Sequence, residues 1–599
     1  MAVYNKNKKY FSFAFYSLLL STTLERGMNH TVCYRFIILF AALLGALRHN
    51  QAQMQFPGAP LGPSAELKAA EVMYVLPPVD PLEVESRMEM NRNNRFKVIE
   101  FATVRTIDLS PETHGTWQTR NGHRVWIAHI VSPGAYSLGL VLNEYRLQQG
   151  VKLFVYDPDM RTIKGAFTSG NNKKSGILPV GHLEGDEVIV ELQVPEGMTD
   201  YGALRIASVS HGYLDLNKHL GAVDCDPGVF GCSQACMIDV NCEEGDHWQD
   251  EKRSVVRIYI TKNSTSEYCT GVLINNSDYD GTPYILTAEH CINKDNFAAN
   301  SVFVFDYESP SCFGGDGDNS RSIAGGELLA VGDSLDFSLI RLSLEPPPAY
   351  DPYYAGWDRT GSYNNPTTSI HHPWGDVKKI TLDYQAPSIP SKQSDVPYAD
   401  LYDYYYFSYW WIKRWDVGST QGGSSGSPLF NTDGQVIGLL SGGSARCGDS
   451  IGYDSDNNRV LYNNAFNVDD YYTQIKFAWD YKSDLDASLK PWLDPGNSGV
   501  TSLGGYEPAG IRPFNKDVNF RFSIFPNPAT RLLHIGTDFI LPGKTTFEIL
   551  SLNGAILLKG QLEPSLLCEV DISSFDPGVY LIRISGNRLQ ETHKLLITP

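Results

Sequence analysis

The chain lacks an excess of positive charge and has few long apolar runs. Its 599 residues include 49 Lys and Arg against 68 Asp and Glu, which gives a formal net charge of −19. This balance argues against nucleic acid and against an anionic membrane surface as partners. Outside the N-terminal region no apolar run approaches the length needed to span a bilayer. We therefore expect a mature protein that is soluble or attached to a surface.

Two short apolar stretches lie at the N-terminus, at residues 10–20 and 36–47. Each is too short to span a bilayer comfortably, and the second follows Arg35 with the length and flanks of a secretory signal. We predict a signal region over residues 1–52, with Met28 as an alternative start. A membrane anchor is the other interpretation of these stretches.

The chain has ten cysteines, and eight of them fall between Cys225 and Cys447. An even number in one region predicts disulfides and an exported protein in an oxidising compartment. The spacing of Cys232, Cys236 and Cys242 could also suggest metal binding, but the nearby histidines are too scattered for a zinc site. We expect neither a metal nor a cofactor.

The pattern of the chain predicts a mainly β protein with several units. Residues 53–95 have weak periodicity and predict a poorly ordered lead-in, whereas strands alternate with turns over 96–209 as in a β-sandwich. The predicted division is a pro-region with this sandwich at 53–227, a strand-rich and loop-rich domain at 228–496, a linker at 497–515 and a small β-sandwich at 516–599.

Residues 423–428 read Gly-Ser-Ser-Gly-Ser-Pro and suit the presentation of a nucleophile. Gly423 and Gly426 allow a sharp turn, which leaves the backbone N–H groups of Gly423 and Ser425 facing a developing oxyanion. A serine hydroxyl needs a base to take its proton and an acid to orient that base. We predict Ser425 as the nucleophile; the alternative is an ordinary Gly/Ser loop.

A histidine and an aspartate with the required roles lie upstream. His290 follows the apolar stretch 284–288, and Asp336 opens the alternating stretch Asp-Phe-Ser-Leu-Ile-Arg-Leu. We predict His290 as general base and then general acid, and Asp336 as the group that holds the imidazole tautomer. Asp333 competes with Asp336, which we favour because the strand behind it can fix its position. The order His, Asp, Ser matches the chymotrypsin arrangement.

Residues 228–496 resemble the lysyl endopeptidase branch of the trypsin-like serine proteases. The matching motifs are Cys236-x5-Cys242-Glu243-Glu244-Gly245-Asp246, Tyr268-Cys269-Thr270-Gly271, Leu286–Cys291, Gly356-Trp357-Asp358-Arg359, Ile370-His371-His372-Pro373 and Gly422–Pro428. The resemblance implies a chymotrypsin-like double β-barrel and hydrolysis of peptide bonds on the carboxyl side of lysine. It also implies the disulfides Cys236–Cys447, Cys242–Cys312 and Cys269–Cys291, with Cys225 and Cys232 left as an extra pair.

The same resemblance implies a pocket carboxylate that binds the substrate lysine. Counting from Ser425 without a gap reaches Asp456, with Asp449 and Asp454 as rivals in the same loop. A buried carboxylate suits a compact ammonium group, and leaving it unpaired would be costly. The preference for lysine over arginine rests on the resemblance; arginine or mixed basic specificity is the alternative.

Further positions near the expected cleft have assigned roles. Ser441, Gly442 and Gly443 lie on the strand after the nucleophile and should pair with the substrate backbone as an added strand. The adjacent His371 and His372 resemble metal ligands, but with Pro-Trp-Gly after them they are expected to shape a loop near the cleft.

The residue before the nucleophile is Ser424, where trypsin has an aspartate that pairs with the freed N-terminus. That ion pair is therefore unavailable to this chain. We predict a zymogen that is activated by removal of the β-rich pro-segment.

The C-terminal unit has its own resemblance, to the type IX secretion sorting domain. Phe525-Pro526-Asn527-Pro528-Ala529, Gly578-Val579-Tyr580 and the final six residues carry it. It implies export by the type IX secretion machinery and a protein secreted from, or attached to the outer surface of, a Gram-negative bacterium. A carbohydrate-binding module is the alternative for this unit, and a surface adhesin without protease activity is the alternative for the chain. We expect a monomer that acts on protein or peptide substrates.

Overall fold

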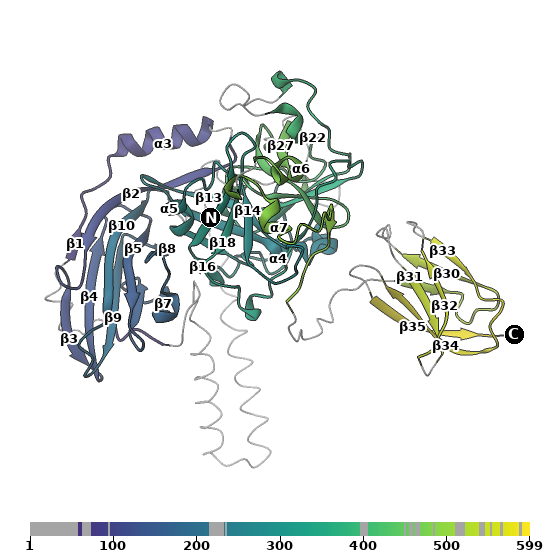
Figure 1. Ribbon diagram of the computed structural model, residues 1–599, viewed down its shortest axis with the longest axis horizontal. Coiled ribbons are helices and arrows are strands. Elements are labelled where there is room, and N and C mark those ends of the chain that lie inside the picture. The colour runs from purple at the N-terminus through teal and green to yellow at the C-terminus, as the bar shows by residue number, and fades with distance from the viewer. Residues whose placement is uncertain are drawn as a thin grey trace, which may run out of the picture.

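A computed structural model gives the fold of the chain (Figure 1). It describes residues 58–62, 73–93, 96–214, 233, 236–395, 405–447, 451–453, 459–461, 468–482, 485–508, 522–537, 546–551, 554–562, 567–585 and 590–598. The predicted signal region and the cysteines Cys225 and Cys232 lie outside these residues. Among the helices within them, none has both the length and the apolar character required to cross a membrane.

The N-terminal unit, called here the N-terminal sandwich, has two β layers. One has the strand order β1-β4-β9-β6-β7 with β3 beside β4, and the other has the order β2-β10-β5-β8. Alternation along β5 brings Leu138, Leu140 and Leu142 into the core that both layers share. The strands are β1 (Met73–Val75), β2 (Ile99–Leu109), β3 (Thr116–Arg120), β4 (His123–Val131), β5 (Ser137–Leu147), β6 (Lys152–Tyr156), β7 (Ile163–Phe167), β8 (Leu178–Glu184), β9 (Glu187–Pro195) and β10 (Gly202–Gly212).

The lead-in before this sandwich is partly ordered, which corrects the expectation for residues 53–95. β1 pairs with β4, and helix α3 (Pro81–Asn93) follows it. The start of α3 has a local cause, because the Asp80 carboxylate accepts a hydrogen bond from the Leu82 N–H at 2.9 Å and proline is favourable at the first helical position. The sequence signal was the Asp-Pro-x-Glu start, which weak apolar periodicity obscured.

The central unit begins with a first β-barrel around an apolar core that includes Ile258, Ile285 and Ile340. β2 of the N-terminal sandwich pairs with β13 of this barrel, so one sheet continues from one unit into the next. The elements are α4 (Glu251–Ser254), β12 (Val255–Thr261), β13 (Thr265–Ile274), β14 (Tyr284–Thr287), α5 (Asp295–Ala299), β15 (Ser301–Val304), β16 (Ser322–Ala324), β17 (Gly326–Gly332) and β18 (Phe337–Leu342).

The second barrel follows, with a core in which Trp357, Phe430 and Trp479 are buried. Its strands are β11 (Ile238–Asp239), β19 (Gly356–Asp358), β20 (Thr367–His371), β21 (Lys379–Asp383), β22 (Tyr409–Arg414), β23 (Pro428–Phe430), β24 (Gln435–Gly443), β27 (Val468–Gln474) and β28 (Ser502–Leu503). The hairpin β25 (Ile451–Tyr453) and β26 (Arg459–Leu461) and the helices α6 (Ile475–Trp479) and α7 (Lys490–Leu493) complete this unit.

The predicted linker at 497–515 starts later than expected. β28 pairs with β19, and Tyr506 forms a bridge with Tyr354 of the central unit. Leu503 is buried in the core of the second barrel. Gly and Ser are abundant in this stretch, which is typical of a linker. The composition therefore gave no sign of the two short pairings with the central unit.

The C-terminal unit is a small β-sandwich with the layers β29-β30-β33 and β32-β31-β34-β35. Its strands are β29 (Phe522–Phe525), β30 (Leu532–Thr537), β31 (Thr546–Leu550), β32 (Ile556–Gln561), β33 (Leu567–Asp571), β34 (Gly578–Ser585) and β35 (Gln590–Ile597). Ile535, Ile549 and Ile582 belong to the core that the layers share. The chain therefore has the mainly β fold class predicted for it.

Candidate active site

The three predicted catalytic residues meet between the two barrels. His290 Nε2 lies 2.7 Å from Ser425 Oγ, and His290 Nδ1 lies 2.9 Å from each carboxylate oxygen of Asp336. His290 follows β14 and Asp336 precedes β18, which pairs with β14, whereas Ser425 precedes β23 of the second barrel. This arrangement allows a proton to pass from the hydroxyl to an imidazole that the carboxylate orients.

Asp336 is held firmly in this position. Its side chain is fully buried, and its Oδ1 also accepts a hydrogen bond from the His290 backbone N–H at 3.0 Å. Its φ of +53° lies in the left-handed region, which aspartate tolerates better than most residues. The rival Asp333 is exposed and instead contacts Tyr481 and Lys482. The geometry thus favours Asp336 as the partner of the histidine.

The turn that carries Ser425 requires its glycines. Gly423 and Gly426 have φ values of +92° and +77°. A Cβ on Gly426 would lie 2.1 Å from Thr287 Oγ1. Thr270 of β13 ties the turn to the first barrel, because its hydroxyl donates to the Gly423 carbonyl at 2.9 Å and its backbone N–H donates to the Ser425 carbonyl at 2.8 Å. The nucleophile is therefore fixed against both barrels.

The position before the nucleophile belongs to a buried neutral network. His371 Nδ1 lies 2.7 Å from Ser424 Oγ, and that hydroxyl also accepts from the Gln421 backbone N–H at 3.1 Å. Burial lowers the pKa of His371 to about 3, so its ring is uncharged near neutral pH. His372 is also fully buried. The His371 side chain contacts the nucleophile turn, whereas the His372 ring lies 2.9 Å from the Asp376 carbonyl; a role in shaping the cleft stays a prediction.

A segment that the sequence analysis gave no role, residues 96–98, lies on the nucleophile. The Ser425 backbone N–H, one of the predicted oxyanion donors, donates a hydrogen bond to the carbonyl oxygen of Lys97 at 3.0 Å. The Phe96 ring centroid lies 4.8 Å from that of His290. Ser425 itself is fully buried. This segment, called here the Lys97 segment, therefore contacts both the nucleophile and the histidine.

The side chain of Lys97 is buried against polar groups of the second barrel, a place called here the Lys97 pocket. Its ammonium group donates to the carbonyl of Ala445 and lies 3.8 Å from Asp470 Oδ1. The other oxygen of Asp470 accepts hydrogen bonds from Trp415 Nε1 at 2.7 Å and Thr420 Oγ1 at 2.6 Å. Burial lowers the pKa of Lys97 and raises that of Asp470 to about 6, and each charge opposes the shift of the other. Among the described residues, the Lys97 ammonium therefore lies beside the buried carboxylate of Asp470, with Asp469 also close enough to favour its charge.

Asp456, the predicted pocket carboxylate, lies outside the described residues, so its role stays a prediction. The carboxylate that contacts a lysine is Asp470 on β27. Asp470 had no predicted role, because the count from Ser425 to Asp456 assumed no gap before β27. The available signal was the Asp469-Asp470 pair at the start of an alternating strand.

Ser441, Gly442 and Gly443 form the end of β24, beside this pocket. Gly442 pairs with Tyr471 and Gly443 with Asp470 across the ladder with β27. These positions flank the pocket carboxylate on a neighbouring strand. Their pairing with a substrate backbone stays a prediction.

The structure contains the three disulfides that the resemblance implied, Cys236–Cys447, Cys242–Cys312 and Cys269–Cys291. The third connects β13 to the residue next to His290. Cys269 and Cys291 also lie close to the His290 ring, but as disulfide sulfurs they lack the thiolates that a metal would need.

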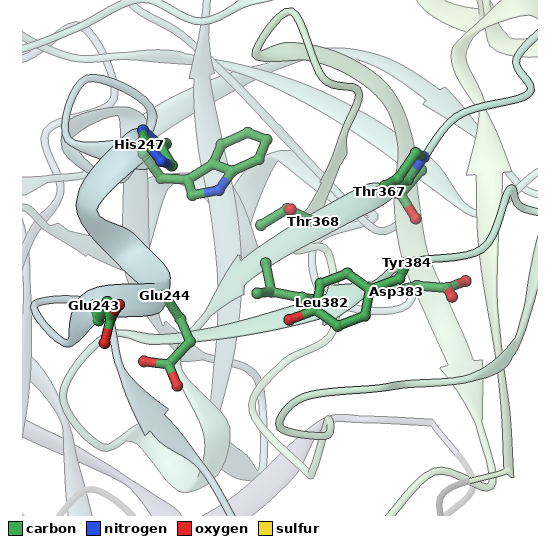
Figure 2. A pocket seen from close by; sticks show the side chains of 10 residues that line it. Glu243, Glu244, His247, Thr367, Thr368, Leu382, Asp383 and Tyr384 are labelled. Atoms are coloured by element: carbon green, nitrogen blue, oxygen red, sulfur yellow. The ribbon is translucent and has the colours of Figure 1, made fainter. Parts of the chain in front are cut away.

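A separate cavity of about 460 Å³ is lined in part by residues of the second barrel (Figure 2). It is lined by Glu243, Glu244, His247, Trp248, Pro366, Thr367, Thr368, Leu382, Asp383 and Tyr384. Burial raises the pKa of Asp383 to about 6. None of the lining residues belongs to the catalytic group, which the Lys97 segment contacts.

The two barrels, with serine, histidine and aspartate in contact between them, define a chymotrypsin-like serine protease fold. Residues 230–459 match the family model of the lysyl endopeptidase C-terminal domain, and residues 523–598 match that of the secretion system C-terminal sorting domain. Both resemblances predicted from the sequence are therefore confirmed.

Individual proteins show the same relationships. The chain is 29% identical over 283 residues to a lysyl endopeptidase of Pseudomonas aeruginosa, an alignment that covers 44% of this chain and 57% of that protein. It is 27% identical over 196 residues to secreted RxLR effector protein 73 of Plasmopara viticola, with 31% and 44% covered. The chain thus spans about half the length of the curated relatives it matches.

Two solved structures are also similar to the chain. The thermostable serine protease AL20 from an extremophilic microorganism is 14% identical with a TM-score of 0.26, over 38% of this chain and 92% of that one. The protease Anisep from Arthrobacter nicotinovorans is 16% identical with a TM-score of 0.26, over 37% and 90%.

Proposed function

We propose that the chain is a secreted serine endopeptidase that hydrolyses peptide bonds on the carboxyl side of lysine. The observation that carries the proposal is the placement of Lys97, with its carbonyl on the Ser425 amide and its ammonium beside Asp470. A substrate lysine takes the same place, so the pocket carboxylate of the enzyme is Asp470.

The reaction follows from the contacts of the three central residues. Ser425 Oγ attacks the carbonyl carbon of the substrate lysine as its proton passes to His290 Nε2, and the developing oxyanion accepts from the Ser425 and Gly423 N–H groups. The C–N bond breaks, and His290 gives the proton to the leaving amine. A water then attacks the acyl carbon with His290 again as base, which releases the new carboxylate and restores the Ser425 hydroxyl.

The preference for lysine over arginine is supported by the partners of Asp470. Trp415 and Thr420 already use one of its oxygens, which leaves a single oxygen for a ligand. An ammonium is a compact charge that one oxygen and the Ala445 carbonyl can satisfy, whereas a guanidinium is a planar fork that suits two oxygens at once.

The C-terminal sandwich is the evidence for the export part of this proposal. Its match to a sorting domain favours passage through the type IX secretion machinery and a location outside the cell or on its outer surface. In this proposal the protease acts as a monomer, and the predicted division of the chain into signal region, pro-region, protease and sorting domain describes its path from synthesis to activity.

The test is cleavage of paired peptides that differ only in lysine or arginine before the scissile bond, with processed wild-type protein and the Ser425→Ala variant. Strong preference for lysine that is lost in the variant supports the whole proposal. Equal cleavage of both peptides keeps the catalytic group and rejects lysine specificity. No cleavage by folded, processed protein favours the adhesin.

A further inference from the structure

The Lys97 segment occupies the proposed active site in the manner of a substrate. The residue whose carbonyl meets the Ser425 amide is the residue whose side chain fills the pocket, and both belong to Lys97. Phe96, one position earlier, packs its ring against the His290 ring. The Lys97–Val98 bond therefore occupies the position of the scissile bond of a substrate.

The chain after this bond is also bound along the protease. β2 runs antiparallel to β13, with Ile99 opposite Tyr268 and Glu100 opposite Glu267. The Phe101 ring stacks on the Tyr268 ring at a centroid distance of 4.3 Å. An extended segment that adds a strand to a sheet gains main-chain hydrogen bonds and pockets for alternate side chains.

A clamp joins the two sides of the Lys97–Val98 bond. Asn91 on α3 donates from Nδ2 to the Glu100 carbonyl at 2.5 Å and accepts from the Glu100 N–H at 3.1 Å. Arg87 of the same helix pairs with the Glu100 carboxylate at 2.5 Å. α3 precedes the bond, and β2 of the N-terminal sandwich follows it (Figure 1). If the Lys97–Val98 bond were cut, the contacts of Asn91 and Arg87 with Glu100 would still hold the two new ends close together.

We propose that the N-terminal sandwich inhibits the protease as a tethered substrate, with Lys97 as the residue in the pocket and Asn91 as the clamp. This inference rests on the proposed function. Attack by Ser425 Oγ on the Lys97 carbonyl carbon forms the acyl bond, breaks the bond to Val98 and sends the hydroxyl proton through His290 to the Val98 amine. Because the clamp holds that amine beside the acyl group, the amine attacks back and re-forms the peptide bond before water completes hydrolysis.

The first experiment measures how fast Ser425 in the intact full chain reacts with a small fluorophosphonate. Lys97→Ala should raise the rate constant at least about tenfold over the wild-type chain, because an intramolecular blocker acts at high effective concentration. The matched control is Lys174→Ala, an exposed lysine of the same sandwich, which should leave the rate unchanged. Equal rates for Lys97→Ala and wild type, with fast reaction of processed protein, would overturn the inference.

If processed protein also fails to react, the proposed function has failed, and a second readout decides the inference without catalysis. Acetylation of lysine amines in the Ser425→Ala full chain, read by mass spectrometry, should leave Lys97 protected while Lys174 reacts. Reaction of Lys97 at the rate of Lys174 overturns the inference. This readout also serves if Lys97→Ala does not fold.

The clamp has its own test. Asn91→Ala should let the chain cut between Lys97 and Val98 accumulate, read as a new N-terminus at Val98. Ser86→Ala, an exposed position on the same helix, should behave as wild type. Equal accumulation in both variants contradicts the role of Asn91.

Discussion

Asp336 combines a buried carboxylate with hydrogen bonds to both the ring and the backbone of His290. Asp336→Asn should lower kcat by roughly 10⁴, because an amide no longer selects the ring tautomer that accepts the serine proton. KM for a lysine peptide should change little. Steady-state kinetics on processed protein checks this, and a kcat within tenfold of wild type would assign the orienting role elsewhere.

Two aspartates, Asp470 and Asp456, are candidates for the carboxylate that binds the substrate lysine, and substitution of each distinguishes them. Asp470→Asn should lower kcat/KM for lysine peptides by about 10²–10³, because removing one partner of a buried charge pair typically costs about 2–5 kcal/mol. Asp456→Asn should leave kcat/KM near the wild-type value. The reverse result would restore the assignment based on counting residues from Ser425.

Buried His371 predicts a pH effect on stability. Its pKa falls to about 3 from an ordinary 6.5, so below pH 6.5 the unfolded chain binds a proton that the folded chain excludes until about pH 3. The stability it contributes is complete above pH 6.5 and is lost as the pH falls through this window. His371→Gln should reduce the loss between pH 7 and pH 5 by about 2 kcal/mol, measured by urea unfolding followed by tryptophan fluorescence. An unchanged loss would contradict this account.

The catalytic group could be predicted because each residue stands next to a local signal: glycines around Ser425, a strand before His290 and a strand after Asp336. The Lys97 pocket could not be predicted, because the position of Asp470 depends on the pairing of β27 with β22 and β24. The placement of Lys97 in this pocket could not be predicted either, because no local sequence pattern distinguishes Lys97 from other lysines. Contacts between residues that lie hundreds of positions apart depend on strand order rather than on neighbours in the chain.

Among the elements, β13 and the segment after β14 are joined by the Cys269–Cys291 disulfide, with a sequence separation of 22. Replacing both cysteines by alanine should cost roughly 3 kcal/mol of stability, because the unfolded loop gains freedom. Both residues are buried beside the histidine, so the loss should appear as a lower Tm of the processed protein with activity retained at 25 °C. An unchanged Tm would mean that packing alone holds the histidine segment.

Some secondary-structure elements could be predicted from the sequence and others could not. Strands in the sandwich and the barrels were predictable, because alternation of apolar and polar residues is a property of the strand itself. α3 and β28 were not, because α3 depends on a cap at Asp80 and β28 on a partner strand, β19. Short elements defined by their partners leave little trace in their own residues.

At the scale of the whole molecule, the C-terminal sandwich has a core of its own. A chain that ends after residue 508 should, once processed, cleave lysine peptides with kcat/KM within about twofold of the longer form, because domains with separate cores fold independently. Peptide kinetics on both forms checks this. A large loss of activity would mean that the sorting domain supports the protease fold.

The pairing of β2 with β13 also matters for the released protease. Without the N-terminal sandwich, residues 265–268 would lack their partner strand and would form an open sheet edge. Unpaired edges invite association with other chains, so natural proteins usually cover them. In the full chain the sandwich therefore covers a sheet edge that would otherwise be open to pairing with other chains.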